Sequence, residues 1–485
     1  MTLPVTILAA VAAVATSVHL PVTTSDARAQ AAVDRGLFLY YAYDGSDAAR
    51  SFAQAATFDP RLAIAYWGIA LGSGPDLNTP MTADRFERAE QAAERAVTLE
   101  AGATPDERRL VAVMARRYHG SFGDWQHNDA AYRDEMLQLA RESSDENVRL
   151  LAAEALLEGG GLEWSNGTPR NESSRQALAL VADVLHDDPA NPMANHLCIH
   201  VYDLAPDRAP ALPCAQRLDA TAFSPQAEHL AHMPAHYWIE TGNYAAALKS
   251  SDRAYALLAA LPGGVAGSEH GRHYGKHDVF VGYSAAMMLG NYVVATLWAQ
   301  RMAAAYDQSF DALTALRFGR YAVAYGAGTG EFGGESARGI AALQLGHTAD
   351  ARAIATRITP ADPKLGYLPQ LFLARLAAAE GRFDDALRWI TQARDNQRAD
   401  FSGEQIPLFP ADEALGDLYL RRGESARAAA AYTGALDAYP NDPRALFGLT
   451  KALTAQGDRA QATAARARFE MQWKGADTDA GDALP

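Results

Sequence analysis

Apolar residues recur along the chain at the three- and four-residue spacing of amphipathic helices, between short polar or glycine-containing breaks. No strand-length alternation of apolar and polar positions occurs between turn signals. Ala, Leu and Arg, which favour helix, are abundant, and runs of β-branched residues are few. We therefore predict an all-α fold. The predicted helix pairs are 83–99 with 105–118, 128–142 with 145–158, 172–187 with 190–203, 208–220 with 225–241, 243–260 with 271–289, and 292–306 with 311–325.

A glycine followed five residues later by an alanine recurs in the C-terminal half of the chain. The pairs are Gly242/Ala247, Gly290/Ala295, Gly346/Ala351, Gly381/Ala386, Gly423/Ala428 and Gly457/Ala462. The last two glycines are 34 residues apart, which is the period of the tetratricopeptide (TPR) repeat, and residues 409–442 resemble its signature position by position. Small residues let paired helices approach, and aromatic side chains fill the space between them. We predict a right-handed α-solenoid of TPR-like helical hairpins.

Interruptions of the helical pattern suggest the domain organisation. At 485 residues the chain exceeds what one hydrophobic core usually supports, which favours an extended repeat array or several domains. The glycine cluster at 326–335 is the predicted bend between a TPR-like section at 30–325 and a C-terminal TPR section at 334–472. Residues 473–485 lack an apolar pattern, so we predict a frayed tail there.

The N-terminal segment is apolar and uncharged over its first 18 residues. We predict a signal peptide at 1–29, because Ala27-Arg28-Ala29 supplies a small-x-small cleavage pattern, although no basic residue precedes the apolar run. A periplasmic or secreted location follows. The alternative is a cytoplasmic protein with an extended start. No second apolar stretch is long enough to span a bilayer, so we expect no integral membrane segment after signal removal.

Charge and cysteine content narrow the function classes. The formal net charge is −15 and no Lys/Arg cluster occurs, which argues against nucleic acid as a partner because phosphates require a basic face. The two cysteines, Cys198 and Cys214, exclude a disulfide framework and a cysteine-based zinc module. They either form one bridge or serve as two small buried apolar residues.

Eight of the 13 histidines lie between His196 and His277. The groups with same-face helical spacing are His196, His200 and Asp203; His229, His232 and His236; and His273 and His277. Three helices thus each present imidazoles from one face. The repeat register makes these helices neighbours on the concave groove, where their imidazoles are expected to converge. Histidines on facing helices are a common way to build a metal site.

The predicted cofactor is one or two copper or zinc ions in that groove. Many imidazoles with few carboxylates suit these metals better than calcium or magnesium, and two sets of three histidines also suit a dicopper centre. The predicted ligands are His196, His200, His229, His232, His236 and His277. In this scheme His277 closes two half-sites formed by the i, i+4 pairs, and His229 is alternatively a residue that orients a neighbour. Other candidates for that orienting role are Asp203, Glu228, His273, Asp278 and Glu154.

Four stretches carry a more specific resemblance: AYWGIALGSGPDLNTPM, NHLCIHVYD, HLAHMPAH and YGKHDVF. They are similar to a mostly uncharacterised family of bacterial TPR proteins with a histidine-rich signature, over residues 34–310. The resemblance implies site roles for His196, His200, Asp203, His229, His232, His236 and His277. The chain departs from the family at Ala235, Asp278 and Phe280, where Ser, Asn and often His or Asp are usual. It also has Tyr43-Asp44-Gly45 where an FNH-like element is expected.

Three function classes follow. A three-histidine metal site leaves a coordination position that activates water or dioxygen, so we favour a metal-dependent hydrolase or oxidase of unknown substrate and unknown catalytic residues. The second class is a non-catalytic TPR scaffold whose groove binds a peptide or protein partner, which the ordinary repeats at 334–472 favour. Metal storage or delivery is the third.

Overall fold

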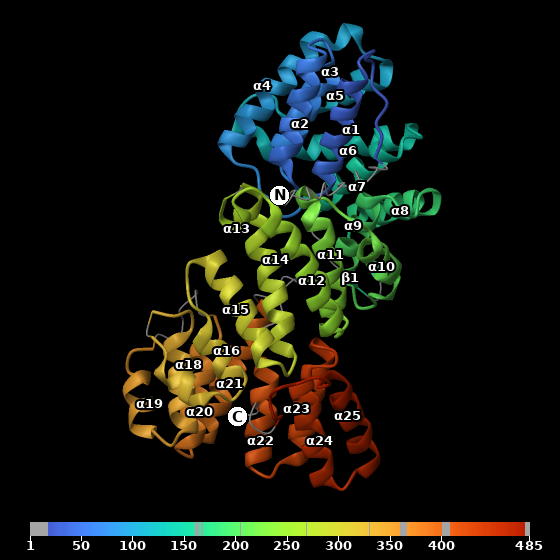
Figure 1. Cartoon of the computed structure of the whole chain (residues 1–485). Coiled ribbons are helices and arrows are strands. Elements are labelled where there is room, and N and C mark those ends of the chain that lie inside the picture. Colours follow the sequence, from blue (N-terminus) through green and yellow to red (C-terminus); the bar gives the residue numbers. More distant parts are fainter. Residues whose placement is uncertain are drawn as a thin grey trace, which may run out of the picture. The chain divides into compact units, whose positions relative to one another are not determined.

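The structure is a computed structural model. It describes residues 18–480, except for 161–163, 166–167, 204, 268, 329, 359–365 and 400–407. Residues 1–17 of the predicted signal peptide therefore lie outside the described residues, and so do residues 481–485 of the predicted tail. Regular structure in the described part is almost entirely helical, which confirms the all-α prediction (Figure 1). One short antiparallel hairpin pairs β1 (Trp164–Ser165) with β2 (Thr168–Pro169).

The described chain divides into two compact units. Unit 1 comprises the described residues up to 201 together with 216–231, and unit 2 comprises 202–215 together with those from 232 onward. This division differs from the predicted one at 326–335, which lies inside unit 2. The glycine cluster there is a loop between two helices that contact each other, α17 (Tyr321–Gly326) and α18 (Gly334–Gln344).

Helices of unit 1 mostly contact their neighbours in sequence. The elements are α1 (Ala27–Tyr41), α2 (Gly45–Phe58), α3 (Ala63–Ser73), α4 (Ala83–Leu99), η1 (Glu100–Gly102), α5 (Pro105–Arg117), η2 (Phe122–Asp124), α6 (Trp125–Glu142), α7 (Glu146–Gly160) and α8 (Glu172–Asp187). The pair α4 and α5 begins and ends where the sequence predicts, within one residue. Both helices start where nearby side chains cap them: Thr82 caps α4, and Thr104 with Glu107 forms a capping box on α5.

The chain passes between the units along three further helices and two 3₁₀ turns: α9 (Pro192–Tyr202), η3 (Ala209–Ala211), α10 (Leu212–Ala220), η4 (Pro225–Ala227) and α11 (Glu228–Glu240). Unit 2 continues with α12 (Tyr244–Ala260), α13 (Gly264–Gly267), α14 (Glu269–Met288), α15 (Tyr292–Tyr306), α16 (Asp311–Arg317), α17, α18, α19 (Thr348–Ala355), α20 (Leu368–Ala379), α21 (Phe383–Ala399), α22 (Ala411–Arg421), α23 (Ser425–Ala438), α24 (Pro443–Gln456) and α25 (Arg459–Gln472).

Aromatic rings seated on glycines bring helices together in both units. In unit 1 the ring of Phe52 lies against Gly36 and Gly68, where an added Cβ would come within 2.8 and 2.1 Å of it. In unit 2 the ring of Tyr432 lies against Gly416 and Gly448, with corresponding distances of 2.5 and 2.3 Å. These contacts are the close approach that the repeat pattern predicts.

The predicted helix at 311–325 is broken in two. Gly319 has φ of +68°, in the left-handed region that glycine adopts without steric cost, and it separates α16 from α17. The N–H of Arg320 then bonds to the carbonyl of Ala315 at 2.8 Å, as in a helix C-terminal cap. The periodic pattern continues across this turn, so periodicity alone does not reveal it.

The tail also differs from prediction over its described part, 473–480. The carboxylate of Asp477 accepts hydrogen bonds from the N–H groups of Tyr292 and Val293 at 2.7 and 3.1 Å, at the start of α15. The indole of Trp473 lies against Gly290. A helix N-terminus leaves N–H groups unpaired, and the tail supplies acceptors for them.

Two further features concern the environment of the chain. Among the described residues, no helix combines the length and apolar character needed to cross a bilayer. Neither cysteine is a free thiol, since Cys198 and Cys214 are each disulfide-bonded. The predicted cleavage motif at 27–29 lies in the first turn of α1, and export stays a prediction.

Candidate metal centre

The six predicted ligands come together as two groups of three. In each group one ligand atom from every residue lies within 4.8 Å of the others. We call them the unit-1 triad (His196, His200 and His229) and the unit-2 triad (His232, His236 and His277). Helix α11 therefore contributes His229 to one triad and His232 with His236 to the other, and His277 closes only the second pair.

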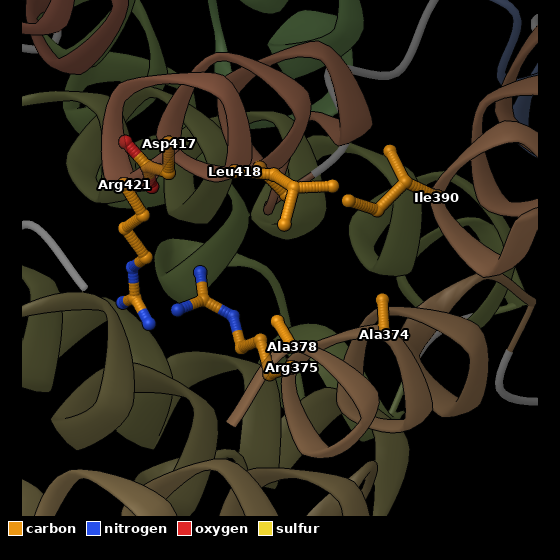
Figure 2. A pocket seen from close by; sticks show the side chains of 8 residues that line it. Ala374, Arg375, Ala378, Ile390, Asp417, Leu418 and Arg421 are labelled. Atoms are coloured by element: carbon orange, nitrogen blue, oxygen red, sulfur yellow. The ribbon is translucent and has the colours of Figure 1, made fainter. Parts of the chain in front are cut away.

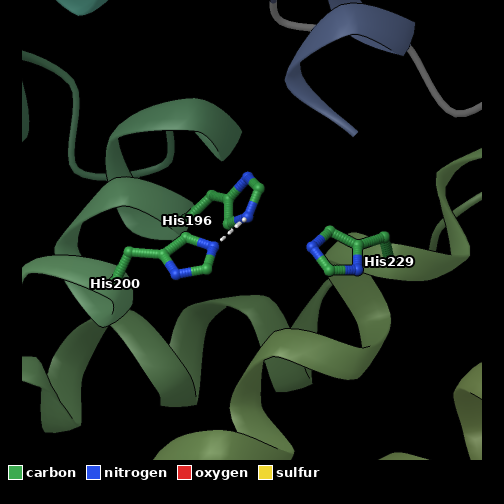
Figure 3. A group of neighbouring side chains, drawn as sticks. All are labelled: His196, His200 and His229. Carbon is green, nitrogen blue, oxygen red and sulfur yellow. Dashed lines mark hydrogen bonds between the residues drawn. The ribbon is translucent and has the colours of Figure 1, made fainter. Parts of the chain in front are cut away.

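The unit-1 triad joins one turn of α9 to the start of α11. His196 and His200 are four residues apart on α9, with their Nε2 atoms 3.1 Å from each other. His229, the second residue of α11, faces them from the other side (Figure 3). All three side chains are buried, with at most 3% of their surface exposed. His229 thus lies with His196 and His200, and both its predicted ligand role and the alternative orienting role stay predictions.

The ring of His196 is oriented by the end of α1. Its Nδ1 lies 3.0 Å from the carbonyl oxygen of Tyr41, the last residue of that helix. Carbonyls in the last turn of a helix have no partner within it, so this oxygen is available to accept the Nδ1–H. The Nε2 lone pair of His196 is then left facing His200. Fixing a tautomer through the other ring nitrogen is the usual arrangement around metal-binding histidines.

His196 is also held in its neutral form. Burial, and next the neighbouring His200, keep the pKa of the imidazole well below its usual value of 6.5. A buried imidazolium has lost its hydration, and a second positive ring beside it is repelled. Neutral imidazole is the form that binds a metal, so the site needs no deprotonation of His196 at neutral pH.

Tyr43 lies against all three rings of the unit-1 triad. Its ring centroid is 4.4 Å from that of His196, 5.4 Å from His229 and 6.0 Å from His200. The residue is 2% exposed and has φ of +56°, a left-handed conformation that costs about 1–2 kcal/mol for a residue with a Cβ. The sequence reasoning noted Tyr43 only as a departure from a family pattern and missed it as a site residue.

The unit-2 triad is formed by α11 and α14. The Nε2 of His236 lies 2.9 Å from that of His232 and 3.1 Å from that of His277, so three Nε2 atoms converge. Pro234 lies between the two α11 histidines, and the helix runs through it without a break. His232 and His236 are buried, whereas His277 is half-buried.

The spacing of the nitrogens fits an ion in the unit-2 triad and an ion shared by His196 and His200 in the unit-1 triad. With metal–nitrogen bonds of about 2.0–2.1 Å, two ligands are separated by roughly 2.9 Å at a right angle and about 3.3 Å at the tetrahedral angle. The measured separations of 2.9 and 3.1 Å fall in that range. The donor set of imidazoles is the one that zinc and copper prefer.

A carboxylate lies beside the unit-2 triad. Asp278 Oδ1 is 3.4 Å from the Nε2 of His232, with side-chain exposures of 4% and 0%. The carboxylate therefore approaches the nitrogen that faces the other histidines, although it is not within ligand distance of the whole group. The orienting role of Asp278 stays a prediction.

The four other predicted orienting residues contribute no ligand atom to either triad. Asp203 is buried directly after α9, and its carbonyl accepts from Arg208 Nε at 3.0 Å. Glu228 is buried next to His229, and His273 is exposed on α14. Glu154 is buried on α7, where burial and the nearby Glu158 raise its pKa well above the usual range.

A pocket in unit 2 is a second candidate binding site. Arg375 of α20 faces Asp417 and Arg421 of α22, with Leu418 and Ile390 beside them (Figure 2). Asp417 also accepts a hydrogen bond of 2.5 Å from the hydroxyl of Tyr432. Two guanidinium groups therefore face one carboxylate that is already engaged, which leaves an excess of positive charge.

Comparison with known proteins identifies the C-terminal region. Residues 341–452 match the family model of the tetratricopeptide repeat-like domain. Similar solved structures are the APC/C hetero-tetramer Cut9–Hcn1 (13% identity, 82% of this chain, 78% of that chain, TM-score 0.35), yeast Tom70 (11%, 92%, 92%, 0.28) and the P58(IPK) TPR domain (12%, 89%, 99%, 0.24). No curated protein matches the chain. The matched residues do not include any of the six predicted ligands, so the histidine-rich family remains a resemblance.

Proposed function

We propose that this chain, whose residues 341–452 match the tetratricopeptide repeat-like domain, binds two transition-metal ions, copper or zinc, one at each triad. The observation that carries this proposal is the unit-2 triad, where three Nε2 atoms converge at 2.9 and 3.1 Å. Each of the six ligands is a side chain of the described residues, and five of the six are buried.

A cluster of ordinary core histidines explains this geometry less well. A pair of imidazole nitrogens about 3 Å apart needs one N–H between them, so three converging nitrogens form at most two such bonds. A cation accepts all three lone pairs at once and leaves every Nδ1–H available as a donor, as at His196.

Metal content is the direct test. Untagged protein should contain about two equivalents of copper or zinc by mass spectrometry, and His200→Ala and His236→Ala should each contain about one. His273→Ala is the matched control, because His273 is an exposed histidine on the same helix as His277. The same metal content in all four proteins, or no metal in any of them, would contradict the proposal.

The reaction class is a finer proposal. Three histidines leave an open coordination position, which favours a metal-dependent hydrolase or oxidase. A storage or delivery protein would instead exchange its metal stoichiometrically and show no turnover. Assays of ester, amide and phosphoester hydrolysis and of dioxygen consumption, with and without chelator, separate these cases, because only an enzyme gives chelator-sensitive turnover.

Peptide binding by the TPR region is the second candidate. The excess positive charge of Arg375 and Arg421 around Asp417 favours an acidic peptide or protein segment. Acidic peptides should bind the protein in a salt-dependent manner, and Arg421→Glu should abolish that binding. Arg466→Glu, which changes an exposed arginine of α25, is the control. Metal-free protein that captures acidic peptides through Arg421 would favour the scaffold function over the metal-dependent ones.

We also propose that the protein is exported. The apolar N-terminal segment with its Ala27-Arg28-Ala29 motif, and the disulfide-bonded cysteines, support a periplasmic or secreted location. N-terminal sequencing of protein from the native cell should begin at Gln30. An intact Met1 in the cytoplasmic fraction would contradict it.

A further inference from the structure

The two triads differ in their access to solvent. In the unit-1 triad each of the three imidazoles has at most 3% of its surface exposed. In the unit-2 triad His277 is half-buried, while His232 and His236 have exposures of 0% and 1%. An ion in unit 2 therefore has solvent on the side of one of its ligands.

A tyrosine ring covers the unit-1 imidazoles. The ring of Tyr43 is nearly parallel to those of His200 and His229, at 19° to each, and its centroid is 4.4 Å from that of His196. A ring at these distances is in contact with all three ligands. The unit-1 imidazoles are thus packed against an aromatic ring, whereas one imidazole of the unit-2 triad is half-buried.

The backbone conformation at Tyr43 indicates that the tyrosine side chain has a role at this position. The N–H of Tyr43 bonds to the carbonyl of Tyr40, and that of Asp44 to Leu39, which is the pattern of a helix C-terminal cap. At the corresponding positions of two other caps the chain has glycine, Gly242 and Gly346. A tyrosine with φ of +56° is strained there, and strain retained at one position points to a role for its side chain.

A carboxylate lies beside the unit-2 triad. Asp278 Oδ1 is 3.4 Å from His232 Nε2. A negative charge beside an open position repels a bare anion and accepts a hydrogen bond from a ligand that carries a proton. The unit-2 centre is thereby suited to water, an alcohol or an amine.

We propose that the two centres are unequal: the unit-2 ion takes a small protic ligand from solvent next to Asp278, and Tyr43 seals the unit-1 ion against exogenous ligands. This inference rests on the proposed metal binding. It assigns the chemistry of the protein to the unit-2 centre, and the unit-1 centre is closed to ligands from solvent.

Azide binding to copper-loaded protein tests the proposal. The double variant His196→Ala/His200→Ala keeps only the unit-2 triad, and His232→Ala/His236→Ala keeps only the unit-1 triad. Azide should give a copper charge-transfer band with the first protein and none with the second. In the second background Tyr43→Gly, which also relieves the backbone strain, should make the band appear, and Tyr43→Phe, which keeps the ring, should not.

Asp278 is tested in the first background. Asp278→Asn should raise the affinity for azide about fivefold, because a nearby negative charge is lost. An azide band from the unit-1 protein with Tyr43 intact, no band from the unit-2 protein, or no response to Tyr43→Gly or to Asp278→Asn would overturn the inference. Copper is quantified in the same samples. If copper is absent from both double variants, the proposed function fails and the inference fails with it, whereas bound copper with the wrong azide pattern overturns the inference alone.

Discussion

At the level of single residues, the carbonyl oxygen of Tyr41 decides which nitrogen of His196 faces the site. The Nδ1–H is used in that hydrogen bond, so only Nε2 is left for a neighbour or an ion. Burial and His200 keep the pKa of this imidazole low. The cost of protonating it in the folded state makes the stability of the metal-free protein depend on pH.

We expect the free energy of unfolding of the metal-free protein to fall as the pH drops below about 6.5. In that range the unfolded chain binds a proton at position 196 that the folded chain does not, which favours unfolding. Glu158, whose pKa burial raises to about 7, acts in the opposite direction, so the comparison is made between variants. Urea unfolding at pH 7.5, 6.5 and 5.5 should give a shallower pH dependence for His196→Gln than for wild type.

The control for this experiment is His273→Gln, at an exposed position. It should retain the pH dependence of the wild type. Identical slopes for wild type and His196→Gln would show that the histidine is protonated without penalty in the folded state, and the account of its burial would then be wrong.

At the level of helices, contacts between aromatic rings and glycines set how closely neighbouring helices approach each other. Tyr432 of α23 lies between Gly416 of α22 and Gly448 of α24. These positions tolerate no side chain, because even a methyl group would overlap the ring. The glycines of the repeat signature are therefore required here because only glycine leaves room for the ring. A glycine-to-alanine substitution, which adds one methyl group, tests this.

Gly448→Ala should destabilise the protein by about 1–3 kcal/mol, because the new Cβ forces the Tyr432 ring or the helix to move. Gly434→Ala is the matched control on α23, where an added Cβ meets nothing within 4 Å. It should be neutral or stabilising by up to about 1 kcal/mol, since alanine favours helix. Urea unfolding measures both. A Gly448→Ala protein as stable as Gly434→Ala would mean that the helices are not held at this separation.

At the level of the whole of unit 2, a buried ionic network joins helices that are distant in sequence. Arg317 of α16 donates to both carboxylate oxygens of Glu413 on α22, at 2.7 and 2.9 Å. Arg444 of α24 donates to the carbonyls of Met287 and Arg317, each at 3.0 Å. Buried charges without partners are costly, so removal of one member exposes the others to the full penalty.

Glu413→Ala should lower the free energy of unfolding by about 3–5 kcal/mol, because Arg317 is left as a buried charge without its carboxylate. Glu424→Ala removes a carboxylate that pairs with the exposed Arg427 at the surface and should cost less than about 1 kcal/mol. If the two substitutions lowered the free energy of unfolding equally, Glu413 would be in contact with water, and the buried ion pair with Arg317 would be contradicted.

Metal binding should also stabilise the folded chain. An ion that binds only the folded state at 100 times its dissociation constant adds about 2.7 kcal/mol for each site. The thermal midpoint should therefore rise when zinc or copper is added to metal-free protein and fall again with chelator. The combined variant His200→Ala/His236→Ala should show no rise, and a rise as large as that of the wild type would place the metal elsewhere.

The sequence by itself determined most of the helices and the same-face pairs of histidines, although not the break at Gly319. These features are local: caps such as Thr104 with Glu107 act within one turn, and the i, i+4 spacing of His196 and His200 sets one face of one helix. The TPR period was legible for the same reason, because each repeat contacts mainly its neighbours in sequence.

Only the tertiary structure decided which histidines belong together. The sequence grouped His229 with His232 and His236 because they share a helix face, whereas packing assigns His229 to α9 and gives His277 to the other pair. Tyr43 and Asp278 acquire their places at the two centres from contacts between helices. Such contacts depend on how far and at what angle helices pack, which no periodic pattern within a single helix encodes.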